Sequence, residues 1–401
     1  MQRMSRPEFI ALIAMMTATI AFSIDSMLPA LPEIGAELSP DDVNRAQLIL
    51  TSFVLGIGVG TFFVGPLSDT FGRKPVIFVG TAIYIAGSAV AYFSTSLELV
   101  LAARVAQGLG VAAPRIVSLA IMRDMFSGRI MARMMSIVMM IFTIVPAIAP
   151  LMGAGIIAFT GWRGIFLAFI LFGSISILWM GLRLAEPLAV ENRRPFRPAL
   201  LWAALIEMVT HPTVRLSIVV QCLCLGMLFT TLTMVQPVYD IVYDRGEEFP
   251  VWFALVALIS GSASVLNAVL VVRIGMRRMV VWSLGLQMVL STFMIFAAFS
   301  DLPEIVAFGL FVFWQATLFF MAGTTLGNLS AMAMEPMGHI AGMAASVIGG
   351  ISTVVAAAIA APVGLLFDGS ILPLAVSVAV MAALGWLILL HLARVEARLP
   401  V

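Results

Sequence analysis

The chain has 401 residues, of which 62% are hydrophobic and 11% charged, with a formal net charge of +1 and a mean hydropathy of +1.10. A soluble protein of this composition would leave a large apolar surface in water, whereas the hydrocarbon of a bilayer covers such a surface without penalty. The composition therefore excludes an ordinary soluble protein and indicates an integral membrane protein.

Apolar segments recur along the whole chain. Windows of about 20 apolar residues, the length that crosses about 30 Å of hydrocarbon, predict an all-α integral membrane protein with twelve transmembrane helices. Six helices begin near residues 8, 45, 76, 98, 132 and 163, and six near residues 213, 250, 277, 303, 336 and 371. The first carries Asp25 and lacks a small-residue cleavage pattern, so we interpret it as a retained span rather than a signal peptide. Cys222 and Cys224 share one predicted helix and point to different sides, which predicts free thiols.

The positive charges indicate an orientation. Most of the 22 Lys and Arg residues fall in loops on one side, where the amino terminus also lies. Arg45, Arg163 and Arg245 fall on the opposite side, and Arg104 and Arg115 fall within a helix. By the positive-inside rule, both termini are predicted to be cytoplasmic.

A polar linker divides the predicted helices into two groups of six. We expect an N-terminal six-helix bundle over residues 1–184, a cytoplasmic linker over 185–211 and a C-terminal six-helix bundle over 212–401. The halves echo each other, because "GPLSDTFGRKPV" follows the second helix and "VLVVRIGMRRMV" the eighth, which places Gly72 and Gly275 at equivalent turns. Two pseudo-symmetric bundles of the same topology suit a protein that rocks around a central cavity.

The segment "GPLSDTFGRKPV" resembles a loop signature of the major facilitator superfamily. It matches at Gly65, Leu67, Asp69, Gly72, Arg73 and Lys74. Gly65 permits close helix approach and Gly72 a tight turn, while Asp69 is expected to form ion pairs with Arg73 and Lys74 that break when the halves rock. The alternative, charges that only set topology, accounts for the cations but not for Asp69 or the glycines.

Three further segments narrow this resemblance. "DSMLPALPEI" (25–34), "RVAQGLG" (104–110) and "MRDMFSGRIMARMMS" (122–136) resemble the bicyclomycin and chloramphenicol resistance branch of the drug:proton antiporters. The family's Gly- and Pro-rich run in its fifth helix appears as "APLMGAG" (149–155), which keeps Pro150, Gly153 and Gly155. Ala149 and Ala154 stand where the family has glycines. The resemblance implies the major facilitator fold and a bend at this motif.

Asp25, Arg104 and Arg115 are the charged residues predicted at membrane depth, where an ionisable group implies either a charged partner or a wet cavity. Asp25 and Arg104 have similar predicted depths, and the resemblance implies that their helices face each other. An arginine does not titrate at ordinary pH, whereas burial and a nearby cation adjust the proton affinity of a carboxylate. Asp25 is therefore predicted to carry a coupling proton opposite Arg104. The alternative is a permanent bridge between the two that only orients helices.

Two other residues have open interpretations. Arg115 follows Arg104 by eleven residues and so lies on nearly the same helical face, deeper toward the cytoplasm. It either binds a polar or anionic group of the substrate or extends along the helix to the membrane boundary. Gln107, one turn from Arg104, either binds substrate or links helices by hydrogen bonding.

The motif content argues against other classes of protein. His211, His339 and His391 lie far apart, and the chain has neither a metal-ligand cluster nor a nucleotide-binding loop nor a basic domain. We therefore expect no enzyme activity, no cofactor, no metal and no nucleic acid.

The predicted function is a proton-coupled secondary transporter that exports small amphipathic molecules by alternating access. It is expected to work as a monomer in a bacterial inner membrane, with the substrate, protons and the lipid bilayer as its partners. The alternative is a transporter of a physiological metabolite, working in uptake or exchange, in which Asp25 and Arg104 bind substrate without coupling protons.

Overall fold

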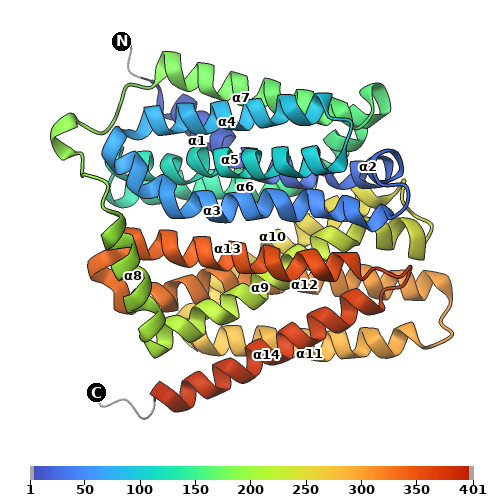
Figure 1. Cartoon of the computed structure of the whole chain (residues 1–401). Helices are drawn as coiled ribbons and strands as arrows, with labels where there is room; N and C mark the ends of the chain where they lie inside the picture. The colour runs from blue at the N-terminus through green and yellow to red at the C-terminus, as the bar shows by residue number, and fades with distance from the viewer. Residues whose placement is uncertain (1–3, 397–401) are drawn as a thin grey trace. The chain divides into compact units, whose positions relative to one another are not determined.

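The computed structural model describes residues 4–396, apart from the side chains of residue 132 and residues 393–396. Every regular element in this part of the chain is helical (Figure 1). The chain divides into two units, Met1–Pro198 and Ala199–Val401, at a point within the segment predicted to be a linker. Both ends of the chain, which were predicted to be cytoplasmic, lie outside the described residues.

Twelve membrane-length helices are present in the described residues. Eleven helical stretches are long and apolar enough to cross a bilayer, and the longest of them, Glu304–Leu365, consists of two helices joined by the 3-10 turn Glu335–Ile340. Six spans lie in each unit. The predicted all-helical membrane fold is therefore confirmed, with the spans beginning within a few residues of their predicted starts.

The first unit contains the helices α1 to α7. Their bounds are α1 Arg6–Asp25, α2 Leu31–Leu38, α3 Leu48–Phe71, α4 Arg73–Phe93, α5 Leu97–Met125, α6 Gly128–Thr160 and α7 Arg163–Arg183. Short 3-10 turns cover Leu28–Ala30, Val43–Gln47 and Val190–Asn192. Figure 1 shows α3, α4 and α5 in blue to cyan, and contacts along their lengths pack α5 against both α3 and α4.

Glycines bring α3 and α5 into close contact. A Cβ atom added to Gly56 would collide with the carbonyl oxygen of Val105, and one added to Gly108 would collide with the carbonyl oxygen of Phe53. Backbone atoms cannot move aside as flexible side chains can, so both positions require glycine. This is the small-residue packing by which membrane helices gain van der Waals contact without a hydrophobic driving force.

The first span changes helix type where the sequence has prolines. Helix α1 ends at Asp25, and the chain continues through the turn Leu28–Ala30 into α2. Pro29 and Pro32 each fall in the first turn of the helix that contains them, where a missing backbone N–H costs nothing. Helix α2 is fastened to the start of α7, because Glu37 pairs with Arg163 at 2.8 Å and accepts a 2.6 Å hydrogen bond from the indole of Trp162.

The second unit holds the helices α9 to α14, with the short helix α8 at the boundary between the units. The bounds are α8 Pro198–Thr210, α9 Pro212–Pro237, α10 Phe249–Ile274, α11 Met276–Ala298, α12 Glu304–Met334, α13 Ala341–Leu365 and α14 Leu372–Glu396. One turn of π-helix, Val238–Val242, extends α9. Gly275 separates α10 from α11 with φ +88° and ψ 149°, and Gly72 separates α3 from α4 with φ +104° and ψ 161°. The two halves therefore make the same glycine turn at equivalent positions.

Candidate functional site

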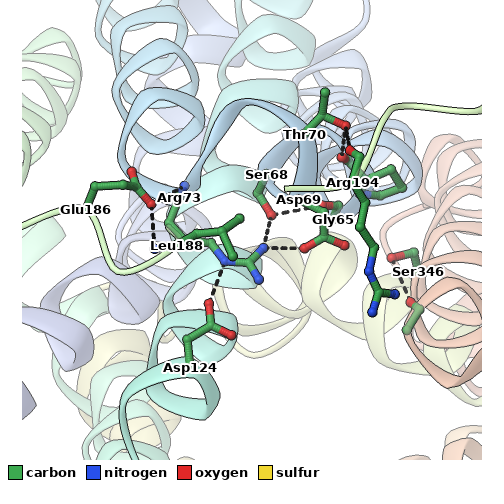
Figure 2. Close-up of polar contacts among 12 residues, drawn as sticks. Gly65, Ser68, Asp69, Thr70, Arg73, Asp124, Glu186, Leu188, Arg194 and Ser346 are labelled. Atoms are coloured by element: carbon green, nitrogen blue, oxygen red, sulfur yellow. Dashed lines mark hydrogen bonds and ion pairs between the residues drawn. The ribbon is translucent and has the colours of Figure 1, made fainter. Parts of the chain in front are cut away.

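The turn between α3 and α4 carries a cluster of charged residues (Figure 2). Gly72 ends α3, and its positive φ lets Arg73 begin α4 without an intervening loop. A side chain at this position would also meet the carboxylate of Glu186 and the guanidinium of Arg193 at 3.0–3.1 Å. Gly72 is therefore required by the backbone conformation, and its surroundings leave little room for a larger residue.

Arg73 is the centre of this cluster. Its Nη1 donates to Asp69 Oδ1 at 2.5 Å and to Ser68 Oγ at 2.7 Å, and its Nε donates to Asp124 Oδ2 at 2.8 Å. The Arg73 side chain is only 8% exposed, whereas the Asp69 side chain is 48% exposed. Asp69 and Arg73 lie one helical turn apart, while Asp124 comes from the last turn of α5. One guanidinium thus ties the α3–α4 turn to the end of α5.

Glu186 caps the start of α4. Its Oε1 accepts from the backbone N–H of Arg73 and its Oε2 from that of Lys74, both at 2.9 Å, and Oε1 also accepts from the N–H of Leu188 at 3.0 Å. The first N–H groups of a helix lack partners within the helix, and the helix dipole favours a negative charge there. The carboxylate of Glu186 satisfies both requirements for α4.

The side chain of Lys74 was predicted to form an ion pair with Asp69, but it contacts backbone carbonyl groups instead. Its Nζ donates to the carbonyl oxygens of Leu184, at 2.5 Å, and of Gly181, at 3.2 Å. Consecutive residues on a helix point about 100° apart. Arg73 therefore reaches α5 while Lys74 reaches the last turn of α7, where carbonyl groups are free to accept a cation.

The segment after α7 runs along the same turn. The backbone N–H of Arg194 donates to the carbonyl oxygen of Asp69 at 3.0 Å, and the hydroxyl of Thr70 donates to the carbonyl oxygen of Arg194 at 2.7 Å. Residues 186–194 thus hold the α3–α4 turn through a carboxylate at one end and backbone hydrogen bonds at the other. This part of the predicted linker belongs structurally to the first unit.

A second polar site lies inside the first unit, around Arg104 of α5. The Arg104 side chain is fully buried, and it donates to Gln107 Oε1 at 2.9 Å and to the carbonyl oxygens of Ser23 at 3.0 Å and Ile49 at 3.3 Å. Its guanidinium carbon lies 4.0 Å from the ring centroid of Phe53. Neutral oxygens and an aromatic face therefore hold this cation among the described residues.

Gln107 extends the network across the bundle. Its Nε2 donates to Ser88 Oγ on α4 at 2.7 Å, and on the other side of the network Ser23 Oγ is 2.7 Å from the hydroxyl of Tyr84. Ser23, Ser88 and Gln107 are all fully buried. Because each of these groups is satisfied, the network fixes the relative positions of α1, α4 and α5.

Asp25 lies next to this network but does not join it. Its side chain is 5% exposed, and among the described residues its carboxylate makes neither a hydrogen bond nor an ion pair. Arg104 instead donates to the carbonyl oxygen of Ser23, two residues earlier on α1. The structure therefore does not contain the permanent bridge that was the alternative interpretation of these two residues.

The helix-five motif approaches Asp25 through one glycine. In α6 a Cβ atom added to Gly153 would collide with the carbonyl oxygen of Ser26, the residue after Asp25. Gly155 has open space around it, and Pro150 lies within the helix, where it removes one backbone hydrogen bond. Of the three motif residues, Gly153 is the one that lets α6 contact the end of α1.

Arg115 is exposed, unlike Arg104 on nearly the same face of α5. Sequence reasoning placed the two arginines together but did not distinguish their surroundings.

Sequence reasoning also missed three residues of the charged turn, Ser68, Asp124 and Glu186. Asp124 lies inside the quoted segment "MRDMFSGRIMARMMS", and Glu186 lies three residues after the last span of the first half, but nothing in the sequence placed either one beside Arg73. Among the side chains that the structure describes, no group of three or more His, Cys, Asp or Glu residues is arranged to hold a metal ion.

Twelve spans in two units of six, joined by a polar segment and carrying equivalent glycine turns, form the two-bundle layout that is typical of secondary membrane transporters. The chain belongs to the Major Facilitator Superfamily, whose family model matches residues 11–361.

Similar proteins agree with this assignment. The bicyclomycin resistance protein homolog of Haemophilus influenzae is 29% identical over 341 residues, which cover 83% of this chain and 82% of that protein. The multidrug resistance protein MdtL of Escherichia fergusonii is 29% identical over 247 residues, which cover 60% of this chain and 61% of that protein. The crystal structure of a D-xylose-proton symporter matches with a TM-score of 0.75 over 95% of this chain and 98% of that chain. At 12% identity, that likeness shows the fold alone.

Proposed function

We propose that this transporter exports small amphipathic molecules across the inner membrane of a bacterium, driven by protons that move inward. The names of the bicyclomycin resistance homolog and of MdtL support drug-like molecules as the substrate class. The proposal includes both termini in the cytoplasm, from the distribution of Lys and Arg, and a monomer that works by alternating access.

One observation carries the proton coupling: the buried carboxylate of Asp25 has no partner among the described residues. An ionised carboxylate buried without a partner pays the full free-energy cost of losing its hydration, because no ion pair or hydrogen bond offsets that cost. A protonated carboxyl group carries no charge and so avoids this cost. The positive charge of Arg104, held only by neutral oxygens, is in turn available to an ionised Asp25 on the neighbouring helix. An ionised Asp25 thus favours a position of the end of α1 in which it pairs with Arg104, and a protonated Asp25 favours a position without a partner. The structure has Asp25 in the position without a partner, which fits the protonated state.

Arg104 and Gln107 act in this scheme as a fixed positive site rather than as groups that contact substrate. Both side chains are fully buried and hydrogen-bonded to each other. Arg115 is exposed, so of the two arginines predicted at membrane depth on α5 it is the one that is free to meet a polar group of the substrate. We propose this role for Arg115 over extension to the membrane boundary.

The charged turn is proposed to be the gating element. The half-exposed Asp69 is the partner that Arg73 can release, while the less exposed Asp124, at 26%, keeps the guanidinium in place. Gly65 and Gly72 provide the backbone freedom around this pair. The motif residues Pro150, Gly153 and Gly155 are proposed to transmit the movement of α1 to α6, through the contact of Gly153 with Ser26.

Transport into everted membrane vesicles tests the coupling. Respiration acidifies the lumen, and vesicles containing the wild-type protein should accumulate radiolabelled chloramphenicol or ethidium against its gradient. The Asp25→Asn variant should lose this accumulation but keep exchange of labelled for unlabelled probe, because the substrate site remains. Asp42→Asn, which neutralises an exposed carboxylate of the loop before α3, is the matched control and should behave as wild type.

The same assay separates the two function hypotheses. If Asp25→Asn still concentrates the probe at the wild-type rate, proton coupling through Asp25 is wrong. A transporter of a physiological metabolite without this coupling would then be the better interpretation. A growth panel of antibiotics in a drug-sensitive host would identify which amphipathic molecules are exported.

A further inference from the structure

An apolar groove runs along the second unit between α10 and α12. Its volume is about 440 Å³, and its lining includes Trp252 and Ile259 of α10 and Phe308, Gly309, Phe313 and Thr317 of α12. The hydroxyl of Thr317 donates to the carbonyl oxygen of Trp314 at 2.7 Å, which satisfies it within its own helix. Ile259 and Phe313 are 50% and 57% exposed. The groove therefore offers an open, almost entirely apolar surface.

The length of the groove matches one leaflet of a bilayer. From Phe308 to Phe320 the lining spans thirteen residues of α12, and their twelve rises of 1.5 Å add to about 18 Å. Each leaflet contributes about 15 Å to the hydrocarbon core. A groove of this length accommodates an acyl chain from the surface of the hydrocarbon to its midplane.

A polar pocket of about 380 Å³ adjoins one end of the groove. It is lined by Val242, Tyr243, Asp244, Arg245, Glu248 and Glu304, where α10 and α12 begin. Trp252 and Phe308 of the groove connect the two sites. The indole of Trp252 packs edge-on against Phe308 and donates to Glu248 Oε2 at 2.8 Å, and the guanidinium of Arg245 lies 4.7 Å from the Phe308 ring centroid.

The charges of this pocket favour a zwitterion. Arg245 donates to Glu248 at 3.2 Å and lies 3.6 Å from Glu304, whose side chain is 72% exposed. With Asp244, the pocket holds three carboxylates and one guanidinium. The hydrogen bond from Trp252, with the charge of Arg245, holds the pKa of Glu248 below its ordinary value, so this carboxylate is ionised at neutral pH. The excess of carboxylates would repel an anionic headgroup, and Arg245 would repel a simple cation. A headgroup that carries both charges avoids both repulsions.

We propose that the groove and its polar pocket bind an aminophospholipid, phosphatidylethanolamine. One acyl chain lies in the groove between α10 and α12, the ammonium group bonds Glu304 and Asp244, and the phosphate lies beside Arg245. This lipid site is separate from the transport site of the proposed function and does not depend on it.

Native mass spectrometry of the full chain in mild detergent tests this site. Phosphatidylethanolamine and phosphatidylglycerol with the same acyl chains are titrated separately, and the fraction of protein with one bound lipid is measured. The wild-type protein should prefer phosphatidylethanolamine by about threefold or more, the effect of one exposed charge pair. Glu304→Gln should remove that preference, whereas Asp301→Asn, which changes a carboxylate three residues earlier that does not line the pocket, should keep it.

A second pair of variants tests the groove itself. Gly309 and Gly327 are exposed positions of α12, and a Cβ atom at either one meets no atom within 4 Å, so both positions have room for a side chain. Gly309→Leu fills the groove and should weaken lipid binding about tenfold, the effect of removing about two methylene contacts. Gly327→Leu lies outside the groove and should bind as wild type.

Three results would overturn the proposal. The first is equal binding of the two lipids by the wild-type protein. The second is equal lipid binding by Gly309→Leu and Gly327→Leu. The third is displacement of the lipid by the cation tetraphenylphosphonium, with weaker displacement in the Glu304→Gln variant. That result would indicate that the groove is an entry path for cationic substrates.

Discussion

Replacing Arg73 with alanine should destabilise the first unit by about 2–3 kcal/mol. The half-exposed Asp69 and the less exposed Asp124 each form an ion pair with Arg73, and partly screened pairs of this kind contribute up to about 1 kcal/mol each. The hydrogen bond to Ser68 contributes about 1 kcal/mol more. The sum is the expected loss in the free energy of unfolding.

Lys74→Ala is the matched comparison on the same turn. Lys74 contacts only carbonyl oxygens at the end of α7, an interaction with a helix terminus that contributes about 0.3–1 kcal/mol. Equilibrium denaturation in detergent, followed by tryptophan fluorescence, measures both variants. A double-mutant cycle of Arg73→Ala with Asp124→Asn should give a coupling energy of about 1 kcal/mol. Equal losses for Arg73→Ala and Lys74→Ala, or a coupling energy near zero, would refute this account of the cluster.

Two further changes test the packing and the electrostatics. Gly108→Ala places a methyl group against the carbonyl oxygen of Phe53 and should cost about 1–3 kcal/mol, seen as a lower thermal midpoint. Gly155→Ala, where the space is open, should leave the midpoint unchanged or raise it, and equal effects of the two variants would contradict the close approach of α3 and α5. The pKa of Glu248 is lowered by the hydrogen bond from Trp252 and by a nearby guanidinium, so its contribution to stability is present above the ordinary value of about 4.3 and is lost as the pH falls below it. The difference in thermal midpoint between wild type and Glu248→Gln should therefore shrink as the pH is lowered from about 6 to about 3, and a constant difference would contradict this contribution.

The sequence predicted the fold well because the bilayer imposes a simple rule. Each span needs about 20 apolar residues with its backbone satisfied internally, and such runs are visible without knowledge of tertiary contacts. The equivalence of Gly72 and Gly275 was likewise visible, since a short turn between two spans leaves few residue types able to adopt a positive φ.

The partners of the charged residues were harder to predict. Asp124 and Glu186 lie 51 and 113 residues from Arg73, and only the packing of α4 against α5 and α7 brings them to the turn. Lys74 was wrongly expected to pair with Asp69, because adjacency in sequence does not fix direction on a helix. For Asp25 and Arg104, the sequence indicated their depth in the membrane but not the neutral oxygens that surround the guanidinium. The roles of both residues in transport remain predictions.

The cap that Glu186 places on α4 has a practical consequence for dividing this protein into separately expressed halves. A split placed directly after α7 would remove the carboxylate that satisfies the first N–H groups of α4, and would free the backbone of Asp69 from Arg194. A protease site or a fusion junction therefore belongs after residue 194, so that the amino-terminal fragment retains the segment that completes its own helix.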